Sequence, residues 1–249
     1  MLINFIFGLI GLIIGSFLNV VIYRLPREES IVFPASHCPE CGHQLSALEL
    51  IPVISYIILR GRCRECGASI SLKYPLVELL TAFLFLINSL VFSSAVNLIA
   101  GLLLSSLLIA LAMIDIQHQI LPDRLTLTGL AAGLLISFIR PGFSPLEAVA
   151  GVLAGGGLLL IIAVISKGGL GGGDIKLMMM VGSFVGPIQV LVAIFLGAIL
   201  GLLTSLPGII SGSLKLKSRL PFGPFLGLAS VIIWLTGSWI LNIYLSLIL

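Results

Sequence analysis

Two aspartates lie in strongly apolar sequence, and a pair of carboxylates can perform acid–base catalysis. Asp115 lies at the end of one long apolar run, and Asp174 follows the glycines 171–173 at the start of another. An ionisable side chain inside a bilayer costs at least about 2.5–3.5 kcal/mol and is therefore a functional candidate. If the two carboxylates meet in a partly dry site, one holds a proton while the other is ionised. The ionised one can take a proton from water, and the protonated one can polarise a peptide carbonyl.

Each aspartate also has a structural interpretation. Asp115 could end a helix at the membrane interface, and Asp174 could cap a helix after the glycine loop. Intramembrane carboxylates also occur in proton-coupled transporters. The spacing of 59 residues does not by itself bring the two side chains together, so the positions alone leave peptidase and transporter open.

The four cysteines form two copies of one motif. Cys38–Gly42 and Cys63–Gly67 both have the pattern C-x-x-C-G, with 21 residues between Cys41 and Cys63. Two thiolates at this spacing can bind one metal ion, and the glycine permits the tight turn that brings backbone N–H groups towards sulfur. Four thiolates complete a tetrahedron without an open position, which predicts a structural zinc site. The predicted ligands are Cys38, Cys41, Cys63 and Cys66.

The segment around the cysteines, residues 24–73, is the hydrophilic part of the chain. It holds six of the thirteen basic residues, five of the ten acidic residues and all four cysteines. Such a short segment builds little core, and a structural zinc can contribute roughly 10–16 kcal/mol to its folding. The alternatives are four unligated thiols or a redox pair, although no βαβ pattern surrounds either motif. His37 and His43 flank the first motif and are interpreted as bystanders.

The rest of the sequence is too apolar for a soluble protein. Of the 249 residues, 59% are hydrophobic and only 9% are charged. A soluble domain is about 45–50% apolar and about 25% charged, and disordered chains combine low hydrophobicity with high charge. A nucleic-acid-binding face needs dense basic charge, which a net charge of +3 does not provide. The composition predicts an all-α polytopic membrane protein that contacts the lipid bilayer and no nucleic acid.

Apolar segments of about 20 residues, the length that crosses a bilayer as a helix, recur along the chain. We predict about eight transmembrane helices, with the bounds 2–23, 74–92, 96–115, 124–139, 146–166, 175–186, 188–210 and 222–248. The segment 175–186 is short and ends at Gly186-Pro187, so a half-helix or a merger with its neighbour is the alternative. The small residues from Gly151 to Gly157 predict close helix packing, with a substrate groove as the alternative.

The basic residues predict the orientation in the membrane. With eight spans and the N-terminus outside, twelve Lys and Arg residues fall in or beside cytosolic segments, and Arg140 alone falls outside. The last of these segments contains Lys215, Lys217 and Arg219. This orientation puts the four-cysteine insert in the reducing cytosol, where disulfides rarely persist, and both aspartates near the cytosolic face.

Several segments, in order along nearly the whole chain, resemble motifs of the type IV prepilin peptidase family, the membrane aspartic proteases of bacteria. They are Gly15–Pro26, the paired cysteine motifs with Lys73–Ala82, Ile114–Asp123, Gly171–Leu177 and Pro221–Leu226. The segment that ends at Asp174 is similar to the G-x-G-D motif shared with presenilin-like proteases. The combination is far more specific than any single motif.

The resemblance implies that the chain cleaves prepilins and pseudopilins after a glycine, at the cytosolic face of the inner membrane, and removes a short basic leader. The catalytic roles carry over to Asp115 and Asp174. Asp123 is the alternative for the first position, although we expect it to cap the helix that opens at Arg124. A prepilin's apolar helix would lie in the bilayer and its basic leader in the cytosol, which puts the scissile bond at the predicted aspartates.

The resemblance also implies methylation of the new N-terminus with S-adenosylmethionine, since the four-cysteine insert fits the bifunctional members of the family. Gly61 and Arg62 lie in the stretch associated with methylation. The sequence has no glycine-rich dinucleotide-binding turn for that cofactor, so methylation rests on the resemblance.

The expected organisation is a first transmembrane helix at 1–23, a zinc-binding insert at 24–73 and a peptidase core at 74–249. Two functions compete with the peptidase: a proton-coupled transporter, and a membrane scaffold whose zinc module binds a cytosolic partner. Transporters often contain internal repeats, whereas the two halves of this chain look unalike. The sequence specifies neither the oligomeric state nor the particular pilin.

Overall fold

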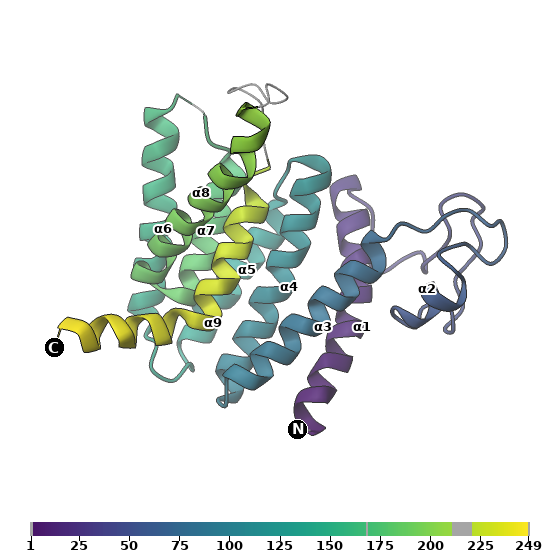
Figure 1. The fold of residues 1–249 in the computed structure, drawn as a ribbon, viewed down its shortest axis with the longest axis horizontal. Coiled ribbons are helices and arrows are strands. Elements are labelled where there is room, and N and C mark those ends of the chain that lie inside the picture. Colours follow the sequence, from purple (N-terminus) through teal and green to yellow (C-terminus); the bar gives the residue numbers. More distant parts are fainter. Residues whose placement is uncertain (1, 168, 211–220, 249) are drawn as a thin grey trace. The chain divides into compact units, whose positions relative to one another are not determined.

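The computed structural model describes residues 2–167, 169–210 and 221–248, whose regular parts are helices (Figure 1). Within these residues the backbone forms isolated bridges but no strand, which confirms the all-α prediction. The chain divides into two compact units, residues 1–93 and 94–249, which we describe separately. The domain boundaries expected at residues 23 and 73 stay predictions. Lys215, Lys217 and Arg219 lie outside the described residues.

The first unit is built on two helices, α1 (Leu2–Arg24) and α3 (Lys73–Val91), which pack against each other. Glycines of α1 permit this packing. A Cβ added at Gly11 or at Gly15 would lie 2.6 Å from a Cα atom of α3. Because a larger residue would meet backbone rather than a flexible side chain, these positions fix the distance between the two helices.

Between α1 and α3 the chain forms the hydrophilic insert, which contains mainly turns. Its short elements are the 3₁₀ helix η1 (Leu25–Arg27) and the helix α2 (Ile54–Ile58). The buried guanidinium of Arg24 donates hydrogen bonds to the carbonyl oxygens of Ser30 (3.0 Å) and Ala35 (3.4 Å). The last side chain of α1 therefore holds the first loop of the insert.

The second unit is a helical bundle. Its helices are α4 (Ala95–His118), α5 (Asp123–Ser137), α6 (Pro145–Ile165), α7 (Gly172–Val185), α8 (Pro187–Ile210) and α9 (Gly223–Ile248). The central one is α7, which packs against α4, α5, α6, α8 and α9. At about 1.5 Å per residue its 14 residues extend roughly 21 Å, less than the roughly 30 Å of a bilayer core. The short segment predicted at 175–186 is therefore a separate, buried helix.

The contact between α6 and α7 depends on facing glycines. A Cβ at Gly151 would lie 2.1 Å from the carbonyl oxygen of Gly182, and one at Gly182 would lie 2.2 Å from the carbonyl oxygen of Gly151. One turn further along, a Cβ at Gly155 would lie 2.5 Å from the carbonyl oxygen of Met178. The predicted close packing of the small residues is confirmed.

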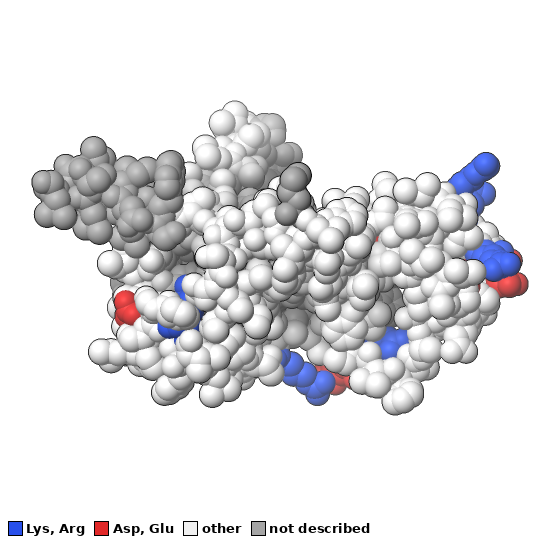
Figure 2. All heavy atoms as spheres, turned by 90° about the horizontal axis from the view of Figure 1, so that it is seen from below, with Lys and Arg blue, Asp and Glu red and all other residues white. Residues whose placement is uncertain are grey.

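All eight predicted apolar segments are helices, with bounds within a few residues of those expected. Among the described residues, five stretches are long and apolar enough to cross a membrane: Leu2–Arg27, Lys73–Val91, Ala95–His118, Pro145–Ile165 and Pro187–Pro207. The surface drawn in Figure 2 is largely uncharged, with few blue and red side chains. Length, hydropathy and surface together identify a multi-pass membrane protein.

Candidate functional site

Asp115 lies in the last turn of α4 and is buried, with 6% of its surface exposed. Its Oδ2 atom accepts a hydrogen bond of 2.9 Å from the backbone N–H of Gly223, the first residue of α9. A Cβ at Gly223 would lie 2.8 Å from the same oxygen. Glycine is therefore needed at this position, because any side chain would displace the carboxylate.

Asp174 lies in the first turn of α7 and is also buried, with 8% exposed. Its backbone N–H donates to the carbonyl oxygen of Gly171 (3.1 Å). A Cβ at Gly171 would lie 3.2 Å from the Oδ2 atom of Asp174, so the preceding glycine leaves room for the carboxylate. Because Gly171 has no side chain, the Asp174 carboxylate can lie directly beside it.

The structure brings the two aspartates together around Leu121. A Cβ at Gly173 would lie 2.9 Å from the Cβ of Leu121, and one at Gly223 would lie 3.3 Å from its Cδ2 atom. Leu121 thus packs beside both Gly173, which precedes Asp174, and Gly223, whose N–H binds Asp115. The two carboxylates are close enough to interact electrostatically. Such a pair of buried carboxylates can hold and transfer one proton.

Asp123 does not join this pair. Both of its carboxylate oxygens accept hydrogen bonds of 2.7 Å from Nζ of Lys176, and both side chains are exposed to solvent. The prediction that Asp123 caps a helix opening at Arg124 is wrong, because α5 begins at Asp123 itself, after Pro122. Its carboxylate links the start of α5 to α7 instead of binding the N–H groups of its own helix.

The four cysteines of the insert form a cluster that could hold a metal ion. Their sulfur atoms all lie within 4.8 Å of one another. Sγ of Cys38 lies 3.9 Å from Sγ of Cys66, and Sγ of Cys41 lies 4.0 Å from Sγ of Cys63. These separations are about twice the length of a disulfide bond, so the four thiols are free and face a common centre.

The two cysteine motifs have the same local geometry. The N–H of Cys38 donates to the carbonyl oxygen of His43, and the N–H of Cys63 donates to that of Ala68, both at 2.8 Å. Gly42 and Gly67 adopt left-handed conformations with φ of 72° and 71°. Each motif therefore forms the tight turn that its glycine predicted.

Glu49 binds the loop that follows the first cysteine motif. Its Oε2 atom accepts hydrogen bonds from the hydroxyl (2.7 Å) and the backbone N–H (2.9 Å) of Ser46, and lies 3.3 Å from Nε2 of His43. The hydrogen bonds from Ser46 lower the pKa of Glu49 to about 2. His43 thus contacts a carboxylate, and the thiol cluster does not need it as a ligand.

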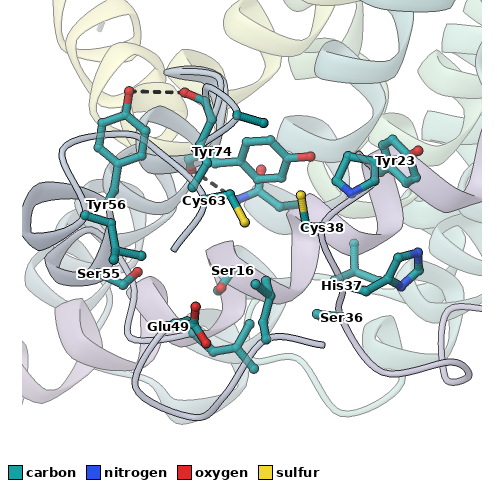
Figure 3. Close-up of a pocket in the computed structure, with 18 of the residues that line it drawn as sticks. Ser16, Tyr23, Ser36, His37, Cys38, Glu49, Ser55, Tyr56, Cys63 and Tyr74 are labelled. Carbon is teal, nitrogen blue, oxygen red and sulfur yellow. Dashed lines mark hydrogen bonds between the residues drawn. The ribbon is translucent and has the colours of Figure 1, made fainter. Parts of the chain in front are cut away.

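A cavity of about 270 Å³ lies within the first unit, between the insert, α1 and α3 (Figure 3). Cys38, Cys63, Glu49 and Tyr56 are among the residues that line it. The sequence patterns do not single out Glu49 or Tyr56 as functional residues. The only signal for Glu49 is the Ser46-x-x-Glu49 pattern of a helix-capping box, which indicates a turn and not a cavity.

Gly61 and Arg62, the residues associated with methylation by resemblance, do not line the cavity themselves. Gly61 is left-handed, with φ of 66°, and a Cβ there would lie 2.8 Å from the hydroxyl oxygen of Tyr56. Arg62 is exposed, and its backbone forms a bridge with Ser69. Gly61 therefore contacts the cavity indirectly, through the tyrosine ring in its wall.

Comparison with known proteins gives matches over both units. The family described as bacterial peptidase A24 N-terminal domain matches residues 9–92, and the type IV leader peptidase family matches residues 102–206. The chain is 39% identical to a prepilin leader peptidase/N-methyltransferase of Dichelobacter nodosus, over 95% of this chain and 92% of the relative. It is 37% identical to the protein of that name from Bacillus subtilis (strain 168), over 96% of each chain.

A third relative, the type 4 prepilin-like proteins leader peptide-processing enzyme of Escherichia coli O78:H11, is 39% identical over 89% of each chain. No solved structure matches the fold. Because the matches cover nearly the whole chain in the order of its motifs, the family resemblance is confirmed. The chain belongs to the type IV leader peptidase family.

Proposed function

We propose that this protein is an aspartic endopeptidase that removes the leader peptide from type IV prepilins and pseudopilins, with Asp115 and Asp174 as its catalytic residues. One observation carries the proposal: two buried carboxylates interact within the unit that matches the leader peptidase family. The relatives' names, which refer to prepilins, support the substrate class.

The chemistry needs one ionised and one protonated carboxylate. If the two carboxylates approach to about 4 Å, they repel by roughly 4 kcal/mol at an effective dielectric near 20, and a pair at that distance retains one proton. The ionised carboxylate takes a proton from water, whose oxygen attacks the scissile carbonyl, while the protonated carboxylate donates to the carbonyl oxygen. The N–H of Gly223 orients Asp115 for this reaction.

The test uses the purified full-length protein in detergent with a prepilin, and reads the intact mass of the product. Wild type should remove the leader, whereas Asp115→Asn and Asp174→Asn should each slow cleavage by about 10²–10⁴-fold or more, since each removes a proton-transfer group. Processing that survives either substitution would reject the pair. A wild type that cleaves no prepilin would favour the transporter or the scaffold.

We further propose that the enzyme N-methylates the new N-terminus, as the relatives' names indicate, with S-adenosylmethionine as methyl donor. The amine nitrogen takes the methyl group, the sulfur keeps the electron pair of the broken bond as S-adenosylhomocysteine, and the nitrogen releases one proton. Gly61 and Arg62 are the residues that the resemblance associates with this step. A mass gain of one methyl group, dependent on the donor, is the expected result.

We propose zinc as the metal of the insert, bound by Cys38, Cys41, Cys63 and Cys66. A tetrahedral site with Zn–S bonds of about 2.3 Å has sulfur atoms about 3.8 Å apart. The separations of 3.9 and 4.0 Å are close to that value. Because four thiolates leave no open position, the ion is structural.

The orientation belongs to the same proposal. We place the protein in the bacterial inner membrane with its N-terminus outside, and the insert and both aspartates at the cytosolic side. The distribution of basic residues supports this orientation. The test is an added cysteine near Arg140 and a thiol reagent that cannot cross the membrane. This cysteine should react in intact cells. If it reacts only after the cytosolic face has been exposed by opening the cells, the opposite orientation is correct.

A further inference from the structure

The cavity of the first unit has the composition of a site for a small cationic molecule with an aromatic ring. Tyrosines from three elements line it: Tyr23 of α1, Tyr56 of α2 and Tyr74 of α3 (Figure 3). Carboxylates of Glu49 and Glu78 lie in the same wall. Its volume of about 270 Å³ is close to the lower end of the range for small-molecule pockets.

One oxygen in this wall has no partner. Among the side chains that the structure describes, Oε1 of Glu49 is the only buried oxygen or nitrogen without a hydrogen bond. The Glu49 side chain is 6% exposed, and only its other oxygen is bound, by Ser46 and His43. Leaving a buried charged acceptor unsatisfied is costly, so this atom calls for a donor from a bound molecule.

Two other charged side chains of the wall, Glu78 and Arg24, already have hydrogen-bond partners. Glu78 accepts the backbone N–H of Val53 at 2.7 Å and a hydrogen bond from the hydroxyl of Ser16. Arg24 donates to the carbonyl oxygens of the first insert loop. Glu40 and Arg64 also line the cavity, but both are exposed to solvent. Glu49 is therefore the buried charged side chain of the wall with a free hydrogen-bonding position.

We propose that this cavity binds S-adenosylmethionine, with the ammonium group of its methionine part donating to Oε1 of Glu49 and its adenine ring against the tyrosines. The inference rests on the proposed methyltransferase function. Aromatic faces bind both purine rings and cationic groups such as the sulfonium. Nothing in the sequence patterns or in the family matches assigns these residues to the donor.

In this placement Gly61 would influence the bound donor through Tyr56 and not by direct contact. A side chain at Gly61 would push against the hydroxyl of Tyr56, which donates to the carbonyl oxygen of Ile70 at 3.3 Å. Cys38 and Cys63 line the cavity as well as the metal cluster. Gly61 is thus a positioning residue for Tyr56, and the metal supports one wall of the cavity.

The test measures binding of tritium-labelled S-adenosylmethionine to the full-length, zinc-loaded protein by equilibrium dialysis. Glu49→Gln should weaken binding by about 10–100-fold, because it removes a charged hydrogen-bond acceptor. The matched control is Glu29→Gln, which removes an exposed carboxylate outside the cavity and should change affinity less than two-fold. Leader cleavage should be unchanged in Glu29→Gln.

A second pair of variants covers the case in which Glu49→Gln loses zinc or stability. Ser55→Phe fills the cavity from α2 and should abolish binding, whereas Ile57→Phe, on the exposed side of the same helix, should not. 5′-Methylthioadenosine lacks the ammonium group, so Glu49→Gln should leave its affinity unchanged. A change equal to that for S-adenosylmethionine would overturn the contact with the ammonium.

The outcomes separate this inference from the function on which it rests. If wild type methylates the product but neither Glu49→Gln nor Ser55→Phe weakens binding of the donor, the cavity is not the binding site. The proposed methyltransferase function would still stand. Wild type that cleaves prepilin, yet neither binds S-adenosylmethionine nor gains a methyl group, overturns both.

Discussion

The insert and the aspartate pair hold their functional side chains by different means. Each cysteine motif is shaped by backbone hydrogen bonds between residues no more than nine positions apart, such as Cys38 to His43. Asp115, in contrast, is held by an N–H group 108 residues away, at Gly223. The thiol cluster depends on local turns and, in our proposal, on a zinc ion, whereas the carboxylate pair depends on the packing of several helices.

This difference determines which substitutions each site tolerates. In the insert, an exposed residue that is neither a ligand nor a turn glycine, such as Glu65, should be replaceable without moving the sulfur atoms. In the bundle, α7 contacts five other helices, so a displacement at any of these contacts changes the position of Asp174. We therefore expect only a few substitutions in the insert to disturb the thiol cluster, whereas substitutions at many positions of the bundle can disturb the aspartate pair.

Removal of the metal should have the largest effect and should be confined to the insert. Cys38→Ser with Cys66→Ser, or a strong chelator, removes a stabilisation of roughly 10–16 kcal/mol from a segment with little core. We expect rapid proteolysis between residues 28 and 72, mapped by mass spectrometry, with α4–α9 still protected. Glu65→Gln, a substitution between two ligands, is the control and should retain protection. Equal proteolysis in both units would show that loss of the metal also destabilises the helical bundle, and would refute a purely local effect.

Substitutions at the α6–α7 contact should have the next largest effect and should act at a distance. Gly151→Ala places a methyl group against the backbone of Gly182 and should cost about 1–3 kcal/mol or more, with reduced leader cleavage. Gly157→Ala on the same helix meets nothing within 4 Å and should be neutral or slightly stabilising. Thermal unfolding in detergent and the cleavage rate measure both effects. Similar behaviour of the two variants would show that the contact does not position Asp174.

The same contrast explains what could be predicted from the sequence. The C-x-x-C-G pattern contains its own geometry, so the cluster and its left-handed glycines could be predicted. The apolar segments predicted the helices and the short length of the one at 175–186, but not that α7 is the central helix, because that depends on its neighbours. The partner of Asp115 and the contact between Asp123 and Lys176 depend on which helix ends meet, and no spacing in the chain records this.

Arg140 provides a further test of packing in the bundle, with an intermediate effect. Its guanidinium donates to Oδ1 of Asn97 at 2.8 Å and to the carbonyl oxygen of Phe184, and it lies over the ring of Trp234. Arg140→Ala leaves these part-buried acceptors without their donor and should cost about 1–3 kcal/mol. Arg140→Lys keeps the charge but not the planar fork, and should recover only part of the loss. If Arg140→Lys unfolds at the same temperature as wild type, the positive charge alone accounts for the stabilisation.

The smallest effect is expected at the exposed pair of Asp123 and Lys176, which links α5 to α7. Ion pairs in contact with solvent contribute about 0–1 kcal/mol and are screened by salt, so Asp123→Asn should change cleavage only a few-fold. Lys176→Gln should have the same effect, and the double variant should add nothing, because either substitution breaks the pair. Cleavage rates at low and high salt measure this coupling. A loss with Asp123→Asn as large as with Asp115→Asn, at both salt concentrations, would instead make Asp123 part of the proton-transfer machinery, since an exposed ion pair alone cannot produce a salt-independent loss of that size.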